Sequence, residues 1–333
     1  MSLTTFIKQK EVKTKLNNYF NMPKFDLGYR KIKANAPKGY KGEDYMLIGT
    51  AFDYLFRFFL AEKHNVKEDF WVAHISLALL IKESANFKIF NHKNFLEDME
   101  VYHKNNAINV GALDKLTKII NKGVCSNLLK EVYNHLSQAE KRYKNYINNG
   151  DFKESIIKAT IDLAKIDKIY RNNIRDIKLG KYKDEHIKDL KSLYQAIPKR
   201  DKKIKKEDVY LNPSFSHSSR VDGADADLII NNTLIDIKTT KYLKLKKDYY
   251  HQLVGYALLA DLDDRFELEK LGIYFSRHGV NYIFDVDNIY SNENYDKFKE
   301  WFLDYTSRKR RLRAEKTLIK NANNFDRGLF PNY

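Results

Sequence analysis

Residues 219–241 read SRVDGADADLIINNTLIDIKTTK, and this stretch decides how the second half of the chain folds. Two short runs of β-type residues, 227–230 and 233–239, lie on either side of Asn231 and Asn232. An asparagine pair suits a tight two-residue turn, which joins neighbouring antiparallel strands. The stretch therefore predicts a β-hairpin whose register is set by its turn.

Counting outward from the turn places Asp227 opposite Asp236. Side chains at directly opposed positions have Cβ atoms about 4.5–5.5 Å apart, so two carboxylates there repel each other. Lys238 shares a face with Asp236, whereas Ile235 and Ile237 point to the other face, toward a core. Carboxylates at this spacing suit Mg²⁺ or Mn²⁺, and with an ammonium group they suit phosphodiester hydrolysis. The alternative is an exposed charge pair on an edge hairpin.

The residues before this stretch predict helices, because apolar side chains recur at three- and four-residue spacing. The predicted helices cover 49–63, 71–83, 128–147 and 155–170, with a stop at 148–150. Residues from about 45 to 197 therefore predict a helical bundle.

Beyond residue 240 the pattern alternates between helix and strand. A helix is predicted at 247–262, strands at 270–277 and 281–286, and a basic helix at 297–320. The charged run 199–208 predicts a solvated linker. These patterns divide the chain into an N-terminal segment (1–44), a mainly helical region (45–200) whose first core helix covers 45–63, and a core (201–333) that ends in the basic helix.

Composition restricts the class of protein. Sixty lysine and arginine residues against 44 aspartate and glutamate residues give a formal charge of +16, which favours nucleic acid as a partner, although a lysine-rich surface alone would have the same effect. Cys125 is the single cysteine, which excludes a disulfide framework, a four-cysteine zinc site and a cysteine-ligated iron–sulfur cluster. The chain has no apolar stretch of membrane-spanning length, and we expect a cytoplasmic protein with no membrane partner.

Four separated segments resemble the PD-(D/E)XK nuclease superfamily, in particular its RecB-like and RecE-like exonuclease branch. Gly223 and Asp227 resemble its first acidic motif, and DIKTT at 236–240 resembles its D-x-K-T motif. The resemblance covers about residues 45–60 and 217–290, and it leaves the helical residues between them as an insertion. It implies an α/β fold in which a mixed sheet forms a restriction-endonuclease-like core beside a large helical region.

The other two segments of the resemblance lie on predicted helices. Gln252 and Tyr256 resemble the Q-x-x-x-Y signature, and GTAFD at 49–53 resembles the G-T-x-x-H segment of the first helix. Here Asp53 stands where the family has histidine. Aspartate is still a competent ligand for a hard metal ion, so we interpret this difference as a substitution.

The resemblance implies a role for each matching residue. The implied metal ligands for Mg²⁺ or Mn²⁺ are Asp53, Asp227, Asp236 and the main-chain carbonyl of Ile237. The implied catalytic residues are Asp227, Asp236, Lys238, Gln252 and Tyr256. Lys238 would be the catalytic lysine, and the glutamine and the tyrosine would support it and touch the nucleic acid.

Asp225 is the alternative to Asp227 as the first acid. In the predicted register it lies opposite Lys238, where its simplest role is an ion pair that orients the lysine. A one-residue slip would turn it to the other face of the sheet, so Asp227 is favoured. His217 is predicted to lie in a polar loop before the motif.

The run SRKRRLR at 307–313 could bind a phosphate backbone. Its candidate nucleic-acid-binding residues are Arg308, Lys309, Arg310, Arg311 and Arg313. The alternative is a solvated helix end.

The leading hypothesis is a metal-dependent deoxyribonuclease, an exonuclease of the RecB-like or RecE-like type that serves DNA repair, recombination, phage replication or defence. Its partner would be single- or double-stranded DNA. The alternative is a catalytically silent or partner-activated nucleic-acid-binding subunit on the same fold. No phosphate-binding loop of the helicase type occurs, so unwinding would come from a helicase or another protein partner.

Overall fold

The hairpin predicted around the asparagine pair forms the middle of a sheet. The computed structural model describes residues 2–66, 68, 71–83, 127–198 and 208–329. In it β2 (Leu228–Ile230) pairs antiparallel with β3 (Thr233–Lys238), and its three residue pairs have the predicted register. The pairing ends at Leu228 and Ile235, so the predicted pair of Asp227 and Asp236 lies just beyond it. Asn231 and Asn232 both have positive φ, 46° and 58°, which is the backbone of a tight hairpin turn.

Five strands make up the sheet, in the order β1-β2-β3-β4-β5. The remaining strands are β1 (Val209–Leu211), β4 (Lys270–Phe275) and β5 (Val280–Asp285). All neighbours are antiparallel except β3 and β4, which are parallel and are joined by α10 (Lys247–Asp261). The carboxyl ends of β3 and β4 therefore meet at one edge of the sheet, and the crossover through α10 begins at that edge.

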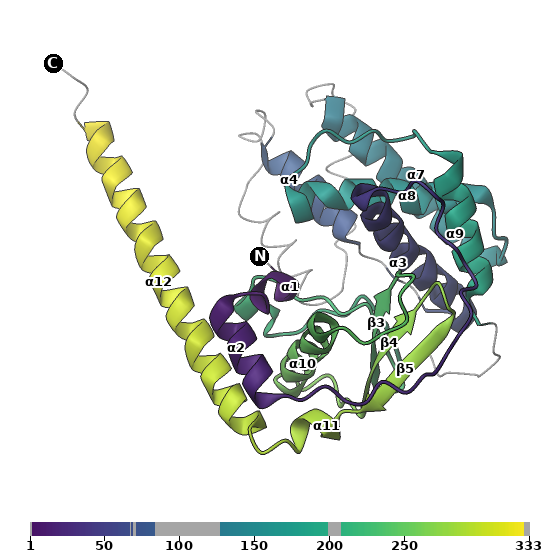
Figure 1. The fold of residues 1–333 in the computed structure, drawn as a ribbon. Coiled ribbons are helices and arrows are strands. Elements are labelled where there is room, and N and C mark those ends of the chain that lie inside the picture. The colour runs from purple at the N-terminus through teal and green to yellow at the C-terminus, as the bar shows by residue number, and fades with distance from the viewer. Residues whose placement is uncertain (1, 67, 69–70, 84–126, 199–207, 330–333) are drawn as a thin grey trace.

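Helices cover both faces of the sheet (Figure 1). One face packs against the helical region, which consists of α3 (Gly42–His64), α4 (Val72–Glu83), α7 (Asn127–Asn149), α8 (Glu154–Asn172) and α9 (Asp184–Ala196). The other face packs against α10, α1 (Leu3–Phe6), α2 (Lys10–Tyr19) and α12 (Tyr295–Leu329), with α11 (Asp287–Tyr290) after β5.

Strand alternation sorts the side chains of β3 between these two cores. Ile235 and Ile237 pack into the core of the helical region, as predicted, whereas Leu234 packs into the core around α10. Asp236 and Lys238 have the parity of Leu234, so they lie on the face that α10 covers. The alternation therefore brings the two charged residues of the D-x-K motif under one helix.

Most predicted elements are confirmed within two residues of their ends, but α12 ends nine residues after its predicted end, and α3 is also longer than predicted. It begins at Gly42, seven residues before the predicted start, because Asp44 accepts a hydrogen bond from the main-chain N–H of Lys41 at 3.0 Å and so caps the helix. Gly49 then lies inside the helix. The helices α1, α2, α9 and α11 and the strand β1 were not predicted individually. Of the predicted linker at 199–208, only Asp208 belongs to the described residues. Cys125 lies outside them.

The N-terminal segment packs against the C-terminal part of the chain. Phe6 contacts Phe302 edge to face at 5.7 Å between ring centres, and Phe20 contacts Phe298 in the same way at 5.1 Å. These contacts place α1 and α2 against α12, almost 300 residues away in the sequence. Within the described residues no helix is both long and apolar enough to cross a membrane.

A buried ion pair fastens the helical region to the edge of the sheet. Arg277, after β4, donates to both carboxylate oxygens of Asp189 on α9, at 2.8 and 2.9 Å, and both side chains are almost completely buried. Two parallel hydrogen bonds fix the relative orientation of the two groups. The edge of the sheet where β3 and β4 end is thereby held against the helical region.

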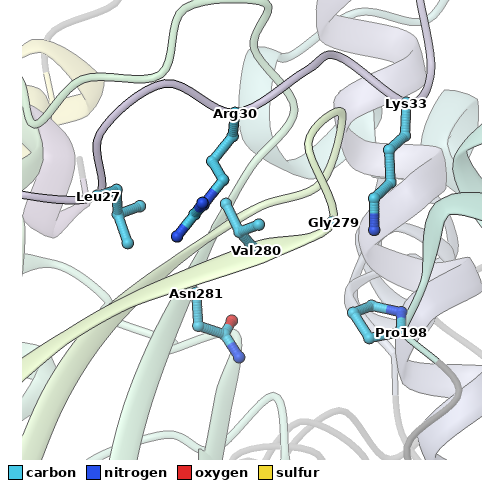
Figure 2. Close-up of a pocket in the computed structure, with 7 residues that line it drawn as sticks. All are labelled: Leu27, Arg30, Lys33, Pro198, Gly279, Val280 and Asn281. Atoms are coloured by element: carbon cyan, nitrogen blue, oxygen red, sulfur yellow. The ribbon is translucent and has the colours of Figure 1, made fainter.

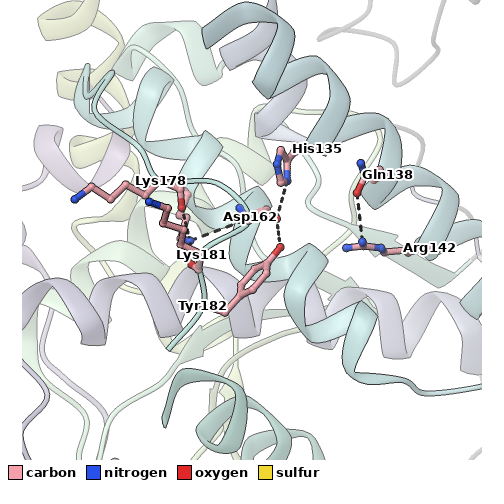
Figure 3. A network of polar contacts seen from close by, with 9 residues as sticks. His135, Gln138, Arg142, Asp162, Lys178, Lys181 and Tyr182 are labelled. Atoms are coloured by element: carbon pink, nitrogen blue, oxygen red, sulfur yellow. Dashed lines mark hydrogen bonds and ion pairs between the residues drawn. The ribbon is translucent and has the colours of Figure 1, made fainter. Parts of the chain in front are cut away.

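A second polar network holds the helical region together (Figure 3). The buried carboxylate of Asp162 on α8 contacts His135 on α7 at 2.9 Å and accepts from Tyr182 at 2.5 Å. It also accepts from the main-chain N–H of Gly180 at 3.2 Å. One carboxylate thus joins two helices to the loop that follows α8.

Candidate active site

The residues of the predicted site form one chain of contacts at the end of β3. Lys238 Nζ lies 2.5 Å from a carboxylate oxygen of Asp236 and donates to Gln252 Oε1 at 3.0 Å. Gln252 Nε2 donates to Tyr256 Oη at 3.1 Å, and Tyr256 Oη donates to the main-chain carbonyl of Asp225 at 2.8 Å. The predicted lysine is therefore held between an acid on its own strand and an amide on α10.

Asp227 lies one residue before β2, where the two strands of the hairpin separate. Its carboxylate accepts a hydrogen bond from the main-chain N–H of Ile237 at 2.6 Å. Burial raises the pKa of Asp227 well above its usual range, and the nearby charges of Asp53 and Asp236 raise it further. Asp227 is thus a partly buried acid close to two others.

Asp236 is 1% exposed, and burial likewise raises the pKa of its carboxyl group, although Lys238 opposes this rise. Burial alone would lower the pKa of the Lys238 ammonium group, but the charges of Asp236 and Asp227 outweigh burial and raise it. The lysine therefore stays protonated at neutral pH.

Asp53 reaches the same place from α3. Its Oδ2 accepts from Arg57 at 3.0 Å, one turn further along the helix. Arg57 is itself buried and also forms an ion pair with Glu68. The substitution of aspartate at the family's histidine position thus comes with an arginine partner on the same helix.

One carboxylate oxygen atom at the site has no hydrogen-bond donor among the described residues, and a second has only an ion pair. Asp53 Oδ1 is buried and accepts no hydrogen bond from any described residue, and Asp236 Oδ2 meets only the Lys238 ammonium group. In the described part of the chain, no group of three histidine, cysteine, aspartate or glutamate side chains is arranged to hold a metal ion as it stands. Mg²⁺ commonly uses only one or two carboxylates and completes its shell with water and phosphate oxygens. The donor set of Asp227 and Asp236 fits that requirement.

Two predicted contacts differ from the geometry. Asp225 was expected to form an ion pair with Lys238, but the lysine pairs with Asp236, and Asp225 contributes its main-chain carbonyl to Tyr256. Tyr256 was expected to touch nucleic acid as well as to support the lysine, but it is only 4% exposed. Its side chain supports Gln252 from beneath.

Three residues near the site were not predicted. Tyr249 lies on α10 three residues before Gln252, and the Lys238 ammonium group is 5.0 Å from the centre of its ring. Arg57 could have been found from its spacing of four residues from Asp53 on a helix. Arg171, at the end of α8, has no such signal, because only the fold brings α8 to the site.

Arg171 shows how the helical region approaches the site. Its Nε lies 3.8 Å from Asp167 Oδ2, and its side chain is 47% exposed. Burial would lower the pKa of Arg171, but Asp167, Asp225 and Asp53 raise it. A half-exposed guanidinium group from α8 therefore lies among the acids at the mouth of the site.

The predicted basic residues of the C-terminal helix lie on α12 and have different neighbours. Arg308 pairs with Asp304 at 2.9 Å, Lys309 forms a hydrogen bond with Gln9, and Arg310 donates to Ser219. Arg311 is exposed, and the side chain of Arg313 lies outside the described residues. His217 contacts the neighbouring Ser216 hydroxyl group in the polar loop predicted for it.

A separate cavity of about 680 Å³ lies beside the turn between β4 and β5 (Figure 2). Arg30 and Lys33 contribute the charges of its lining, and Gly279 and Asn281 lie opposite them. None of the acids of the candidate site lines it. It is a basic hollow at the same edge of the sheet, and no carboxylate or histidine lines it.

Comparison with protein-family models, with curated proteins and with solved structures gives no match for this chain.

Proposed function

We propose that this chain is a divalent-metal-dependent nuclease that hydrolyses phosphodiester bonds of DNA. The observation that carries the proposal is the chain of contacts from Asp236 through Lys238 and Gln252 to Tyr256, with Asp227 beside it. A buried acid and a partly buried acid next to one protonated lysine are costly for folding unless their charge is used. The formal charge of +16 supports a polyanionic substrate.

Asp227 and Asp236 would hold the metal ion, with the main-chain carbonyl of Ile237 as a further ligand and Asp53 within reach. Burial raises the pKa of both hairpin acids, and repulsion from Asp53 raises both further. Repulsion from Asp236 adds to the rise at Asp227, and a dication removes such repulsion. When bound, Mg²⁺ or Mn²⁺ lowers the pKa of its water and withdraws charge from the phosphate.

Lys238 supplies the positive charge that meets the negative charge developing on the phosphate oxygens. Gln252 fixes the ammonium group from the side opposite Asp236, and Tyr256 fixes the amide. The three residues form a preorganised support, because each polar side chain is already hydrogen bonded before substrate arrives.

The resemblance to the RecB-like and RecE-like branch supports an exonuclease. The test is degradation of linear, end-blocked and circular DNA, each single- and double-stranded, in Mg²⁺, Mn²⁺ or EDTA. We expect metal-dependent degradation of linear substrates. Lys238→Ala and Asp236→Ala should each abolish this degradation, while circular dichroism shows that both variants remain folded. DNA binding without cleavage in either metal would contradict the nuclease and favour a nucleic-acid-binding subunit.

A further inference from the structure

Lysine and tyrosine side chains alternate along a path that starts at the candidate site. Lys238 Nζ and Lys246 Nζ lie 5.0 and 5.3 Å from the centre of the Tyr249 ring. Lys246 Nζ also lies 5.9 Å from the centre of the Tyr242 ring, and Lys241 Nζ lies 5.1 Å from the same ring. Five side chains from the end of β3, the following loop and the start of α10 thus form one stack.

The stack runs from the surface to the interior. Tyr242 is 54% exposed, and Lys241 and Lys246 are exposed beside it. Tyr249 is half-buried, and the Lys238 side chain at the inner end is 18% exposed. The outer ring of the stack is therefore accessible from solvent beside two exposed lysines.

The backbone of this loop is anchored, so the outer ring has a defined place. Leu245 is buried in the core around α10, and the main-chain N–H of Tyr242 donates to Thr240 Oγ1 at 3.1 Å. Ser276, beyond β4, donates to Thr239 Oγ1 at 3.0 Å. The path is therefore tied to the ends of both parallel strands.

The charge of the segment is strongly positive. Residues 238–248 contain five lysines and one acid, Asp248, whose side chain lies 3.8 Å from Lys13. Rings interleaved with lysines are the arrangement that binds single-stranded nucleic acid, since unpaired bases stack on the rings and phosphates meet the ammonium groups.

We propose that Tyr242, Tyr249, Lys241 and Lys246 form a binding path for single-stranded DNA that leads to Lys238. Only an unpaired nucleotide can present the face of its base to a side chain, because duplex bases stack on one another. Stacking of a base on a ring is stronger than an exposed contact between a lysine and a ring, so the strand can displace the lysines onto its own phosphates. The delivery of the strand to Lys238 rests on the proposed nuclease function, whereas the binding itself does not.

The experiment measures binding without cleavage. Fluorescence anisotropy in EDTA follows a labelled single-stranded oligothymidylate and a blunt duplex of equal length. We expect tighter binding of the single strand by the unaltered chain. Tyr242→Ala should weaken single-strand binding about 5- to 20-fold, with duplex binding unchanged, and Tyr242→Phe should restore it because the ring is kept. The matched control is Tyr210→Ala, which removes a tyrosine on β1 that is 41% exposed and should change neither affinity.

Salt dependence tests the lysines separately. Replacing Lys241 and Lys246 together by alanine should lower the slope of log K against log salt concentration by about 1.4, since each phosphate contact on a single strand contributes about 0.7. An unchanged affinity in Tyr242→Ala, or an equal loss of single-strand and duplex binding, would overturn the proposed path. Because no metal is present, these results stand whether or not the chain proves to be a nuclease.

Discussion

Replacing Asp227 by asparagine tests whether the negative charge of this residue destabilises the metal-free fold. The amide keeps an oxygen that can accept from the Ile237 N–H, but it removes the charge beside Asp53 and Asp236. Two unit charges about 5 Å apart repel by about 3 kcal/mol at an effective dielectric constant of about 20. Attraction to Lys238 and the weaker hydrogen bond to a neutral acceptor offset part of this, by about 1–2 kcal/mol. We therefore expect Asp227→Asn to raise the unfolding free energy of the metal-free protein by about 1–2 kcal/mol at pH 8.

The assay is urea unfolding of both proteins, in EDTA and again in about 10 mM Mg²⁺. If the ion binds with a Kd of about 1 mM, the unaltered protein gains about 1.4 kcal/mol from it. The variant should gain much less, because it has lost one of the two ligands. In Mg²⁺ the excess in unfolding free energy that the variant has in EDTA should therefore become smaller or change sign.

A matched control is Asp264→Asn, which neutralises an exposed acid. It should change neither the metal-free stability nor the gain from Mg²⁺ by more than about 0.5 kcal/mol. The reasoning is refuted if Asp227→Asn destabilises the metal-free protein while keeping the full gain from Mg²⁺, since the carboxylate would then be a structural acid.

Three further predictions concern the support of the site. Gln252→Ala should lower kcat for DNA cleavage about 10- to 100-fold at unchanged KM, because Lys238 loses the oxygen that fixes it; a change in KM alone would argue against this role. Arg277→Ala should lower the unfolding free energy by about 3–5 kcal/mol, since it leaves the buried Asp189 carboxylate without its partner, and a loss below about 1 kcal/mol in urea unfolding would contradict the importance of this pair. Burial raises the pKa of Asp167 to about 6, so the folded state binds a proton more tightly than the unfolded state between about pH 4 and 6. Relative to Asp167→Asn, the unaltered protein should therefore lose about 3 kcal/mol of unfolding free energy as the pH rises through that range, and a relative gain would show the opposite sign.

The hairpin could be predicted from sequence because its determinants are local. An asparagine pair fixes the turn, and strict alternation then assigns each side chain of β3 to a face. The pairing of Gln252 with Tyr256 follows from their spacing on a helix in the same way. These contacts need only a turn and two periodicities, so the central part of the site follows from residue spacing.

The remaining parts depend on contacts between distant segments. Arg171 reaches the acids only because α8 packs along α3, and no pattern within α8 indicates this. The packing of Phe6 on Phe302 joins segments almost 300 residues apart and has no local signature. The expected pairing of Asp225 with Lys238 was wrong because the hairpin strands separate beyond Leu228, so that the register cannot be extended past the last paired residue.

The charge of Lys238 is the point on which the proposed chemistry depends. The most direct test compares the initial rate of DNA degradation in Mn²⁺ for the unaltered protein, for Lys238→Ala and for Lys270→Ala, which removes an exposed lysine at the start of β4. We expect metal-dependent cleavage that falls at least about 100-fold in Lys238→Ala and is unchanged in Lys270→Ala. Full activity in Lys238→Ala, or cleavage that persists in EDTA, would contradict a metal-dependent nuclease site at the end of β3.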